Sequence, residues 1–438
     1  MQRIISDAAL KSAFSPLESY ASAALAVSGG PDSMALMHLA SRWVVLVGRR
    51  AESIAVLTVD HGLRPESASE AAFVAAEAKR LGFAHATLTW AGEKPKTGVQ
   101  AAARRARYAL MTAYCGAHNI ACLATAHTAD DQAETFLMRL RRGSGLDGLA
   151  AMATVSMRSG TPIVRPLLGF SKSRILAYLR AREATFVCDP SNSNLAFERV
   201  RLRSAMKALA AAGIARKALA LSAARLGRSR EALAWAAEGF LEQGFTVTPL
   251  GQGEIARDAF RALPAEIALR VLAQTLALIG GKEEPPRMAK LERLMEELAR
   301  GRFEVTLGGC LIVAARDALQ VYREPGRLAR TPLPCLPGDT CLWDGRFMLT
   351  FSPRLAGGVF VAPLGESGFA AWRKQLKESR VCQGVNRLAA LTAPALWRGG
   401  KLLAAPALNY VNPAIAGPAG PPATLQLAPR LSRFLKRN

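Results

Sequence analysis

The chain has 438 residues, half of them hydrophobic, which suggests roughly two to three domains and excludes a small disulfide-stapled or wholly disordered protein. Its 57 Lys and Arg residues outnumber 34 Asp and Glu residues, giving a net charge of +23 and a strongly positive surface field. A polyanionic partner is therefore expected. Nucleic acid fits this field better than a membrane surface does, because phosphate contacts dominate the affinity of nucleic-acid binders.

Cysteine usage and the N-terminal segment bear on location. Seven Cys residues with no CxxC pair argue against a secreted disulfide framework and against a zinc ribbon, so a reducing cytoplasm is expected. Asp7 and Lys11 interrupt what would be the apolar region of a signal peptide. Apolar runs such as 271–279 are shorter than the roughly 20 residues that cross a bilayer, so no membrane attachment is expected.

β-prone runs alternate with Ala-rich helical stretches from about residue 22 to 190. Four such runs, each followed by a polar or Gly-bearing turn, occupy 23–28, 53–60, 85–90 and 120–126. Four βα units in series predict an α/β fold, a parallel sheet with helices on both faces. Parallel sheets bind ligands at the carboxyl ends of their strands. The chemistry is therefore expected in the segments that follow these strands, 28–33, 60–65, 91–100 and 127–135.

The first of these segments is Ser28-Gly29-Gly30-Pro31-Asp32-Ser33, where a strand is expected to run into a helix. Two glycines permit a tight turn, and free N–H groups at the helix start would hold a phosphate together with two Ser hydroxyls. The chain has no GxxxxGK[ST] motif and no GxGxxG turn after a strand. A Gly-Gly turn alone is often a plain connection. In this position the segment resembles the PP-loop of ATP pyrophosphatases, which holds the pyrophosphate portion of ATP.

Three carboxylates crowd one expected helical turn in the segment 127–135. Asp131 and Glu134 are three residues apart and share a helix face, while Asp130 and Glu134 are four apart. One interpretation is an acidic first turn that complements the helix dipole, with Asp130 as its cap. The interpretation favoured in so basic a chain is that the acids bind Mg²⁺ or a cationic substrate amine.

Two His residues and an Arg pair accompany these segments. His127 precedes the acids and His61 follows the second strand; each could contact ATP phosphates or transfer a proton, although a lone His is more often a packing residue. Arg104 and Arg107 lie one turn apart on an expected helix. They form a solvated basic face, or they stabilise charge that develops as pyrophosphate departs. The sequence leaves both interpretations open.

The rest of the chain is expected to form a mainly helical module and then a small α+β module. Residues 199–230 carry nine basic residues and no acid, helices are predicted over 263–279 and 287–300, and a hairpin over 303–315. The Pro-rich segment 331–339 is expected to be a linker. Beyond it, strands are predicted at 346–351, 358–363 and 401–408, followed by a flexible segment at 417–423 and a basic tail at 430–438.

Several further motifs extend the resemblance beyond the PP-loop. They are SGGPDS (28–33) itself, VDHGLRPES (59–67), GVQAAARRARY (98–108), AHTADDQAETFLMRLRRGSGLDGLAAM (126–152), VRPLL (164–168) and DPSNSNLAFERVRLR (189–203), with LGGC (307–310) and YRE (322–324) farther on. Together they resemble the tRNA(Ile)-lysidine synthetase family of bacterial PP-loop enzymes. The block RRGSGLDGL with RPLL and DPSN is far more specific than the PP-loop alone. The resemblance is continuous over the first half of the chain and looser from residue 331.

The resemblance implies ATP-dependent ligation of free L-lysine to C2 of the wobble cytidine in isoleucine tRNA with the anticodon CAU. ATP would adenylate the cytosine C2 oxygen and release pyrophosphate, after which the lysine ε-amine attacks C2 and AMP leaves. Relatives also suggest a homodimer. The implied domains are a PP-loop catalytic domain (1–215), a mainly helical tRNA-binding domain (216–330) and an α+β tRNA-binding domain with the basic tail (331–438).

The same resemblance implies roles for individual residues. Asp32 would offset phosphate charge with Mg²⁺, and Asp131 and Glu134 would hold the lysine ammonium, one of them helping to remove its proton. Arg104 and Arg107 would face the nucleotide or the flipped base. The nine cations of 199–230 would follow the tRNA backbone. The remaining candidates are catalytic His127, the ATP-binding residues Ser28, Gly29, Gly30, Pro31 and Ser33, and the substrate-binding residues His61, Asp130, Arg139, Arg141, Arg142, Arg201 and Arg203.

Other functions remain alternatives. A tRNA thiolase also adenylates a base, but it needs a sulfur-carrying Cys or cluster ligands, and Cys115 and Cys122 have no CxxC spacing. No glutaminase domain for an amidotransferase is evident. A non-catalytic RNA-binding protein would keep the positive charge but need not keep the PP-loop and the acids together. Two departures from the family pattern, Cys188 before Asp189 and Val200, alter local contacts only.

Overall fold

The protein is described by a computed structural model that covers residues 5–62, 66–92, 94–95, 97–187, 198–301, 303–329, 331–375, 385–412 and 421–435. It divides into two compact units, Met1–Arg230 and Glu231–Asn438. Among the described helices none is long and apolar enough to span a bilayer. Of the motifs quoted above, residues 63–65 and 188–197 lie outside the described residues.

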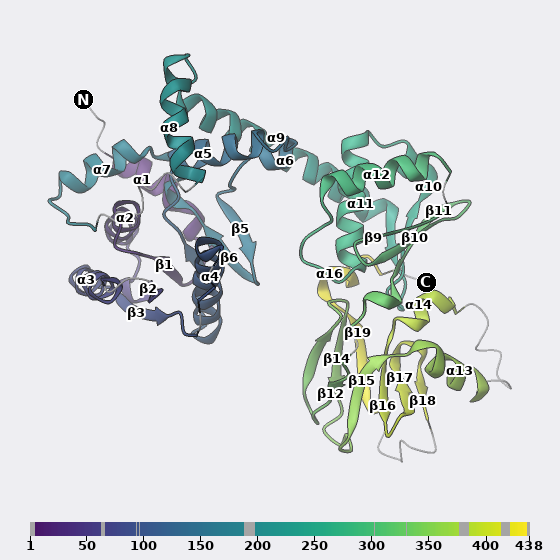
Figure 1. The fold of residues 1–438 in the computed structure, drawn as a ribbon. Coiled ribbons are helices and arrows are strands. Elements are labelled where there is room, and N and C mark those ends of the chain that lie inside the picture. Colours follow the sequence, from purple (N-terminus) through teal and green to yellow (C-terminus); the bar gives the residue numbers. More distant parts are fainter. Residues whose placement is uncertain are drawn as a thin grey trace. The chain divides into compact units, whose positions relative to one another are not determined.

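The first unit is built on a six-stranded sheet in the order β3-β2-β1-β4-β6-β5 (Figure 1). The strands are β1 (Ala23–Ala26), β2 (Ile54–Asp60), β3 (Ala84–Thr89), β4 (Cys122–Ala124), β5 (Val155–Arg158) and β6 (Thr161–Val164). β1, β2 and β4 lie within their predicted runs, and β3 begins one residue before its run; the four strands pair in parallel, which confirms the α/β class. β6 adds in parallel to β4, and β5 pairs with it antiparallel at the edge, a hairpin that the βα pattern did not predict.

Helices cover both faces of this sheet. They are α1 (Asp7–Phe14), α2 (Pro31–Val47), α3 (Ser67–Arg80), α4 (Val99–Ala117), α5 (Ala129–Leu140), α6 (Leu146–Leu149) and α7 (Lys172–Arg180). Successive residues of β1 alternate between two cores: Ala23 and Leu25 join a cluster with α2, whereas Ala24 joins one with Tyr108 of α4. The carboxyl ends of the strands are thereby left open to the loops that carry the predicted chemistry.

Two basic helices pack against α5 of the first unit. They are α8 (Glu198–Ala211) and α9 (Arg216–Gly244). A small core cluster joins Phe136 of α5 to Met206 of α8 and Ala223 of α9. This packing places cationic side chains of the 199–230 segment against the helix that carries the three predicted acids.

The second unit begins with an antiparallel sheet in the order β7-β8-β11-β10-β9. Its elements are β7 (Phe245–Val247), β8 (Gly253–Ala256), α10 (Arg257–Arg261), α11 (Ala265–Ile279), α12 (Met288–Ala299), β9 (Glu304–Leu307), β10 (Cys310–Ala314) and β11 (Ala318–Arg323). Both predicted helices and the predicted hairpin are present. The sequence did not reveal that this hairpin is part of a five-stranded sheet.

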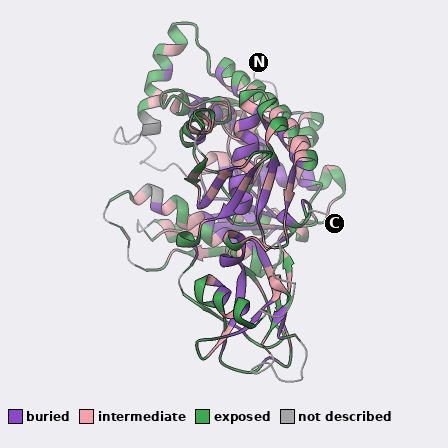
Figure 2. Ribbon diagram, turned by 90° about the vertical axis from the view of Figure 1, so that its right-hand side faces the viewer, coloured by how far each residue is buried: buried purple, intermediate pink, exposed green. Residues whose placement is uncertain are grey.

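Two further sheets follow, ordered β12-β15-β16-β17-β18 and β13-β14-β19. Their elements are β12 (Leu333–Pro334), β13 (Thr340–Trp343), β14 (Phe347–Phe351), β15 (Val359–Pro363), α13 (Gly365–Gln375), α14 (Arg387–Leu391), β16 (Pro394–Arg398), β17 (Lys401–Ala405), β18 (Tyr410–Val411), β19 (Ala423–Leu427) and α16 (Pro429–Ser432). Short 3₁₀ helices occur at Ser15–Leu17, Ala51–Ser53, Pro166–Gly169, Pro325–Arg327 and Pro406–Leu408. The strands of this unit combine buried and exposed residues, as in β14, where residues 347, 349 and 351 are buried; Figure 2 colours the chain by this burial.

Two expectations for the C-terminal region are corrected. The predicted linker 331–339 contributes strand β12, which pairs with β15, and its Cys335 is buried. The predicted basic tail is part of a core up to residue 435: Phe434 is only 5% exposed and its ring lies 5.1 Å from that of Phe245. Of the segment expected to be flexible, 417–420 lies outside the described residues, while Ala423 begins β19.

A buried ionic group joins the two halves of the second unit. Asp344 accepts two hydrogen bonds from Arg323 at the end of β11, both at 2.9 Å, and one from Arg346 at 2.8 Å. Arg346 is fully buried, and burial lowers its pKa to about 10 although Asp344 opposes this shift. These hydrogen bonds join residues that lie before and after residue 330 in the sequence. The boundary between the second and third domains, which the sequence suggested at residue 330, stays a prediction.

Candidate active site

The PP-loop lies between β1 and α2 and is held closed by one side chain. Ser33 Oγ accepts a hydrogen bond from the backbone N–H of Ser28 at 3.1 Å and donates one to the carbonyl of Gly30 at 2.8 Å. Gly29 has φ +80°, a conformation that favours glycine. Gly30 is the N-cap and Pro31 begins the helix, so the first N–H groups of this 17-residue helix point into the loop.

The helix that carries the acidic turn is capped two residues earlier than the sequence suggested. Thr128, not Asp130, is the N-cap of α5. Asp131 completes a capping box: its Oδ2 accepts hydrogen bonds from the Thr128 backbone N–H at 2.8 Å and from the Thr128 hydroxyl at 2.9 Å. The cap therefore fixes the orientation of the Asp131 carboxylate and uses one of its two oxygens.

The other two acids of the turn accept hydrogen bonds from distant cations. Asp130 accepts a bond from Arg216 Nη1 at 3.0 Å and one from the backbone N–H of Lys172 at 2.7 Å. Glu134, whose side chain is 4% exposed, accepts a bond from Arg203 Nε at 2.6 Å. The basic helices α8 and α9 are thus tied to the acidic turn of α5.

Lys172 connects the acidic turn to the PP-loop. Its ammonium donates to Asp32 Oδ2 at 3.2 Å, while its backbone N–H bonds to Asp130. Burial raises the pKa of Asp32 and the neighbouring Asp131 charge adds to this rise, whereas Lys172 lowers it. Two sequence segments that were predicted separately therefore form one electrostatic site.

This site has an excess of negative groups. In the described part of the chain, four carboxylates (Asp32, Asp130, Asp131 and Glu134) meet three cations (Lys172, Arg203 and Arg216). Asp32 Oδ1 and Glu134 Oε2 are buried and have no hydrogen-bond partner among the described residues. Because a buried carboxylate oxygen without a partner is unfavourable, the arrangement favours binding of a further cation.

The described residues contain no group of three or more His, Cys, Asp or Glu side chains placed to hold a metal ion by themselves. Asp32 still fits one side of a Mg²⁺ shell, since it is a carboxylate with a partnerless buried oxygen beside a phosphate-binding loop. Phosphate oxygens of ATP would then have to supply other ligands, as is usual for Mg²⁺ in nucleotide sites.

His61 lies at the end of β2, against the ring of Trp90 at 6.1 Å. Burial lowers its pKa, and the Arg107 charge lowers it further, so the ring is neutral at pH 7. His127 hydrogen-bonds to the Thr125 hydroxyl through Nδ1 at 3.0 Å. The interaction of Arg107 with His61 shows that these two predicted residues lie close together, beside the carboxyl end of the sheet.

The remaining predicted residues are farther from the acids or point elsewhere. Arg104 lies over the ring of Tyr108, and no bond links it to the acids within the described residues. Arg139, Arg141 and Arg142 are exposed at the C-terminal end of α5, about 15 Å along the helix from its acidic turn. Arg201 is exposed on α8. Their predicted contacts with tRNA stay predictions.

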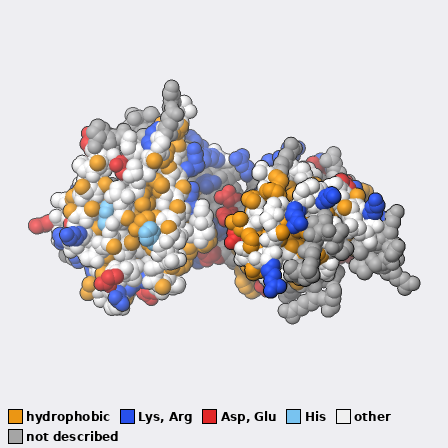
Figure 3. All heavy atoms as spheres, turned by 90° about the horizontal axis from the view of Figure 1, so that it is seen from below, with side chains coloured by type: hydrophobic (Ala, Val, Ile, Leu, Met, Phe, Trp, Pro, Cys, Tyr) orange, Lys and Arg blue, Asp and Glu red, His pale blue; other side chains and the backbone are white. Residues whose placement is uncertain are grey.

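Two residues of the site were missed by sequence reasoning. Lys172 follows the RPLL motif closely, after the N-cap Ser171, and this helix start was a usable signal. Arg216 was counted among the nine cations without being singled out, and nothing local marks it. Figure 3 shows Lys and Arg side chains in several separate patches on the face in view, so surface charge alone does not identify a site.

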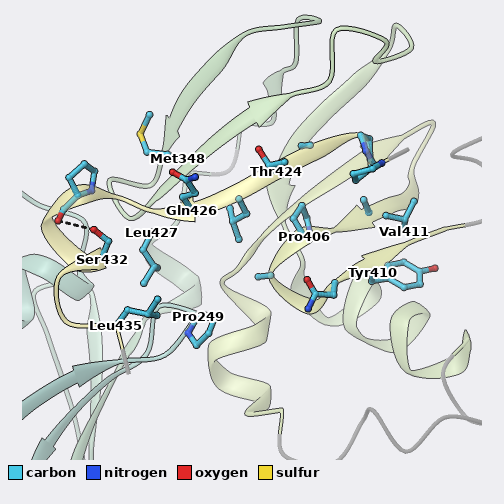
Figure 4. Close-up of a pocket in the computed structure, with 18 residues that line it drawn as sticks. Pro249, Met348, Pro406, Tyr410, Val411, Thr424, Gln426, Leu427, Ser432 and Leu435 are labelled. Carbon is cyan, nitrogen blue, oxygen red and sulfur yellow. Dashed lines mark hydrogen bonds between the residues drawn. The ribbon is translucent and has the colours of Figure 1, made fainter. Parts of the chain in front are cut away.

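A pocket of about 830 Å³ lies in the second unit and is not part of this site. Figure 4 shows its lining, which includes Pro406, Tyr410 and Leu427 and is mainly apolar. It presents no carboxylate or cationic side chain among the residues that line it, so it offers none of the chemistry predicted for the chain.

Known proteins are similar to this chain over most of its length. Residues 4–209 match the family model of the PP-loop domain ATP_bind_3. A tRNA(Ile)-lysidine synthase from Ruegeria pomeroyi is 40% identical over 393 residues, which cover 89% of this chain and 89% of that protein. One from Bradyrhizobium sp. is 44% identical over 348 residues, covering 74% and 96% respectively. The solved structure of a U34-tRNA thiolase from Methanococcus maripaludis covers 51% of this chain and 78% of its own, with 16% identity and a TM-score of 0.43.

Proposed function

We propose, because the chain belongs to the tRNA(Ile)-lysidine synthase family, that it ligates free L-lysine to C2 of the wobble cytidine of isoleucine tRNA with the anticodon CAU. As a member of this family it is an ATP-binding PP-loop enzyme that modifies tRNA. The substrate amino acid, the modified atom and the Mg²⁺ requirement belong to the proposal.

The observation that carries the proposal is the unpaired negative charge beside the PP-loop. Glu134 Oε2 lacks a partner within the described residues, and the Asp131 cap uses only Oδ2 of that carboxylate. A lysine ε-ammonium supplies one positive charge and three N–H donors, which matches these oxygens. The distal charge of a free lysine would thus be recognised within the site that also holds ATP.

The two chemical steps need different groups. In the first, the cytosine C2 oxygen attacks the α-phosphorus of ATP and pyrophosphate leaves toward the PP-loop, where the α2 N-terminus stabilises its charge. When bound, Mg²⁺ would supply positive charge to the phosphates from the side of Asp32. Arg107, beside a neutral His61, would face the same phosphates.

In the second step, the lysine nitrogen forms a bond to C2, the bond from C2 to its oxygen breaks, and AMP leaves with that oxygen. The ammonium must first lose a proton, because a protonated amine has no lone pair. Glu134 or Asp131 would accept this proton at an oxygen that the described hydrogen bonds do not use. Arg203, which bonds to the other oxygen of Glu134, would hold that carboxylate in position.

The test is incorporation of labelled lysine into purified isoleucine tRNA bearing CAU, with ATP and Mg²⁺, against methionine tRNA as the control. Label in the first tRNA only, with AMP formed, supports the proposal. Sulfur transfer or AMP release without lysine label would replace it by the thiolase alternative, and no nucleotide turnover would leave an RNA-binding protein. The homodimer and the cytoplasmic location stay predictions.

A further inference from the structure

Three guanidinium groups surround one buried tyrosine in the first unit. Arg158, Arg104 and Arg107 lie 4.3, 5.4 and 5.9 Å from the ring centre of Tyr108. Tyr108 is 3% exposed in the middle of α4, whereas Arg158 ends the edge strand β5 and is exposed. Arginines from two distant parts of the chain are thus gathered on a shared aromatic support.

A fourth arginine adjoins this group. Arg165 donates from Nη1 to the carbonyl of Ala153 at 2.8 Å and to the hydroxyl of Ser156 at 3.0 Å. Its Nε is buried and has no acceptor among the residues that the structure describes. The pKa of Arg165 is lowered, first by burial and then also by the charges of Arg104 and Arg158. The four guanidinium groups therefore form one cationic cluster.

Two arginines of this cluster lack a counter-ion. Arg104 and Arg158 have no carboxylate partner within the described parts of the chain, in contrast to Arg203 and Arg216 at the acidic turn. Like charges held close together repel, and an anion that binds between them relieves this repulsion. The Nε donor of Arg165 has no acceptor among the described residues, and a phosphate oxygen would satisfy it.

The chemistry of the ligand follows from these donors. A planar guanidinium matches the oxygens of a phosphate, and phosphate could come from an RNA backbone or from ATP. Arg158 is exposed on β5, the edge strand of its sheet, where an extended polyanion can reach it. An exposed sheet edge suits an RNA backbone better than the triphosphate of ATP, which is assigned to the PP-loop.

We propose that Arg104, Arg158 and Arg165, assembled on Tyr108, bind a backbone phosphate of the substrate tRNA, whereas their neighbour Arg107 faces the phosphates of ATP. This inference rests on tRNA as the substrate. It gives the antiparallel edge hairpin β5–β6, which the βα pattern did not predict, a place in tRNA recognition.

The test compares Arg158→Gln with Arg182→Gln. Arg182 is a matched control, because it is also exposed and lies over a tyrosine, Tyr178, at 4.9 Å; among the described residues no other guanidinium stacks on that ring, although the charge of Arg42 lies near the Tyr178 side chain. Affinity for isoleucine tRNA is measured by filter binding over a range of salt concentrations. ATP affinity and thermal unfolding are measured on the same proteins.

Arg158→Gln is expected to weaken tRNA binding about threefold to tenfold and to reduce the slope of log affinity against log salt by about 1, with ATP affinity unchanged. Arg182→Gln is expected to match the wild type. Equal slopes for wild type and Arg158→Gln would overturn the proposal, as would a loss of ATP affinity in place of tRNA affinity. A changed slope without any lysine incorporation by the wild type would keep this site and refute only the proposed ligation.

Discussion

Glu134 and Arg203, which are 69 positions apart in sequence, share a hydrogen bond of 2.6 Å between Oε1 and Nε. Glu134 is almost wholly buried, and Arg203 comes from a basic helix that would otherwise be assigned to tRNA contact alone. The pair therefore links the basic helix α8 to the acidic turn of α5. Arg203 also holds the carboxylate of Glu134, one of the two that are proposed to bind lysine.

Replacing Glu134 with Gln is expected to affect both stability and lysine use. The amide oxygen still accepts a bond but carries no charge, so Arg203 loses its counter-ion, and the free energy of unfolding should fall by about 1–3 kcal/mol. The KM for lysine should rise at least about tenfold, as expected for the loss of one charge-assisted contact. Urea unfolding and initial rates at varied lysine would measure the two effects. An unchanged KM would remove Glu134 from the lysine site.

Asp131→Asn tests charge without disturbing the helix start. The Asn carbonyl can still accept from the Thr128 N–H and hydroxyl, so the cap geometry should persist. We expect lysine transfer to fall by at least about a hundredfold while tRNA affinity stays near that of the wild type. Thr128→Ala is the control: it loses the cap, at a cost of about 1 kcal/mol of stability, but keeps the carboxylate. A large loss of tRNA binding by Asp131→Asn would contradict the assignment.

The raised pKa of Asp32 predicts a trade-off between stability and activity. Below its ordinary value of 3.8 the carboxyl is protonated in both folded and unfolded chains, so it has no effect. Between 3.8 and the raised folded pKa the folded state binds more protons, so stability falls as pH rises, and the loss persists above that window. Asp32→Asn should therefore have a higher free energy of unfolding than the wild type at pH 7, and this difference should become smaller as the pH falls toward 4. The same variant should release no pyrophosphate from ATP.

Unfolding curves from pH 4 to pH 8 would measure the difference in the free energy of unfolding. A variant less stable than the wild type at pH 7 would refute the prediction. Lys172, which is 39% exposed, can be solvated when its partner is neutral.

The nine cations of residues 199–230 do not share one role. Arg203 and Arg216 bond to the acids of α5, whereas a larger group is exposed on the two helices: Arg201, Lys207, Lys217, Arg225 and Arg228. Replacing three of these exposed residues, Lys207, Arg225 and Arg228, with Gln should reduce the salt slope of tRNA binding by about 2–3 if each contacts a phosphate. Circular dichroism would confirm folding, and an unaltered slope would show that these helices do not bind the tRNA backbone.

The C-terminal segment is expected to act as core rather than as a free tail. Phe434→Ala should lower the free energy of unfolding by about 3–5 kcal/mol, because a nearly buried ring that packs on Phe245 is removed. Arg433 pairs with Glu238 at the surface, so Arg433→Ala should cost less than about 1 kcal/mol. Thermal and urea unfolding of the two variants would separate these outcomes. Equal stabilities would mean that the segment does not contribute to the core.

Local patterns were sufficient for much of the fold. The four strand runs and the PP-loop were predictable because each lies within one short stretch of sequence. Thr128-x-x-Asp131 is itself a capping-box pattern, so the cap assigned to Asp130 was an avoidable error. Leu431 and Phe434, three residues apart, likewise signalled a buried face within the supposed tail.

Long-range contacts were not predictable in this way. The bond from Lys172 to Asp32 spans 140 positions, and only the packing of α7 against α2 creates it. The edge hairpin β5–β6 consists of two four-residue strands, too short for a clear alternation. The gathering of Arg104 and Arg158 on Tyr108 depends on that hairpin and was equally invisible.

The buried group of Arg323, Asp344 and Arg346 restricts how this protein could be shortened in evolution. A chain that ended at residue 330 would lose Asp344 and leave Arg323, 6% exposed in the full chain, without its counter-ion at the end of β11. Arg323 would keep its hydrogen bonds to the carbonyls of Gly309 and Arg327, and water would have to solvate the rest of its charge. Loss of the C-terminal sheets would therefore expose a cation that the full chain keeps buried, and a substitution at position 323 would favour such a change.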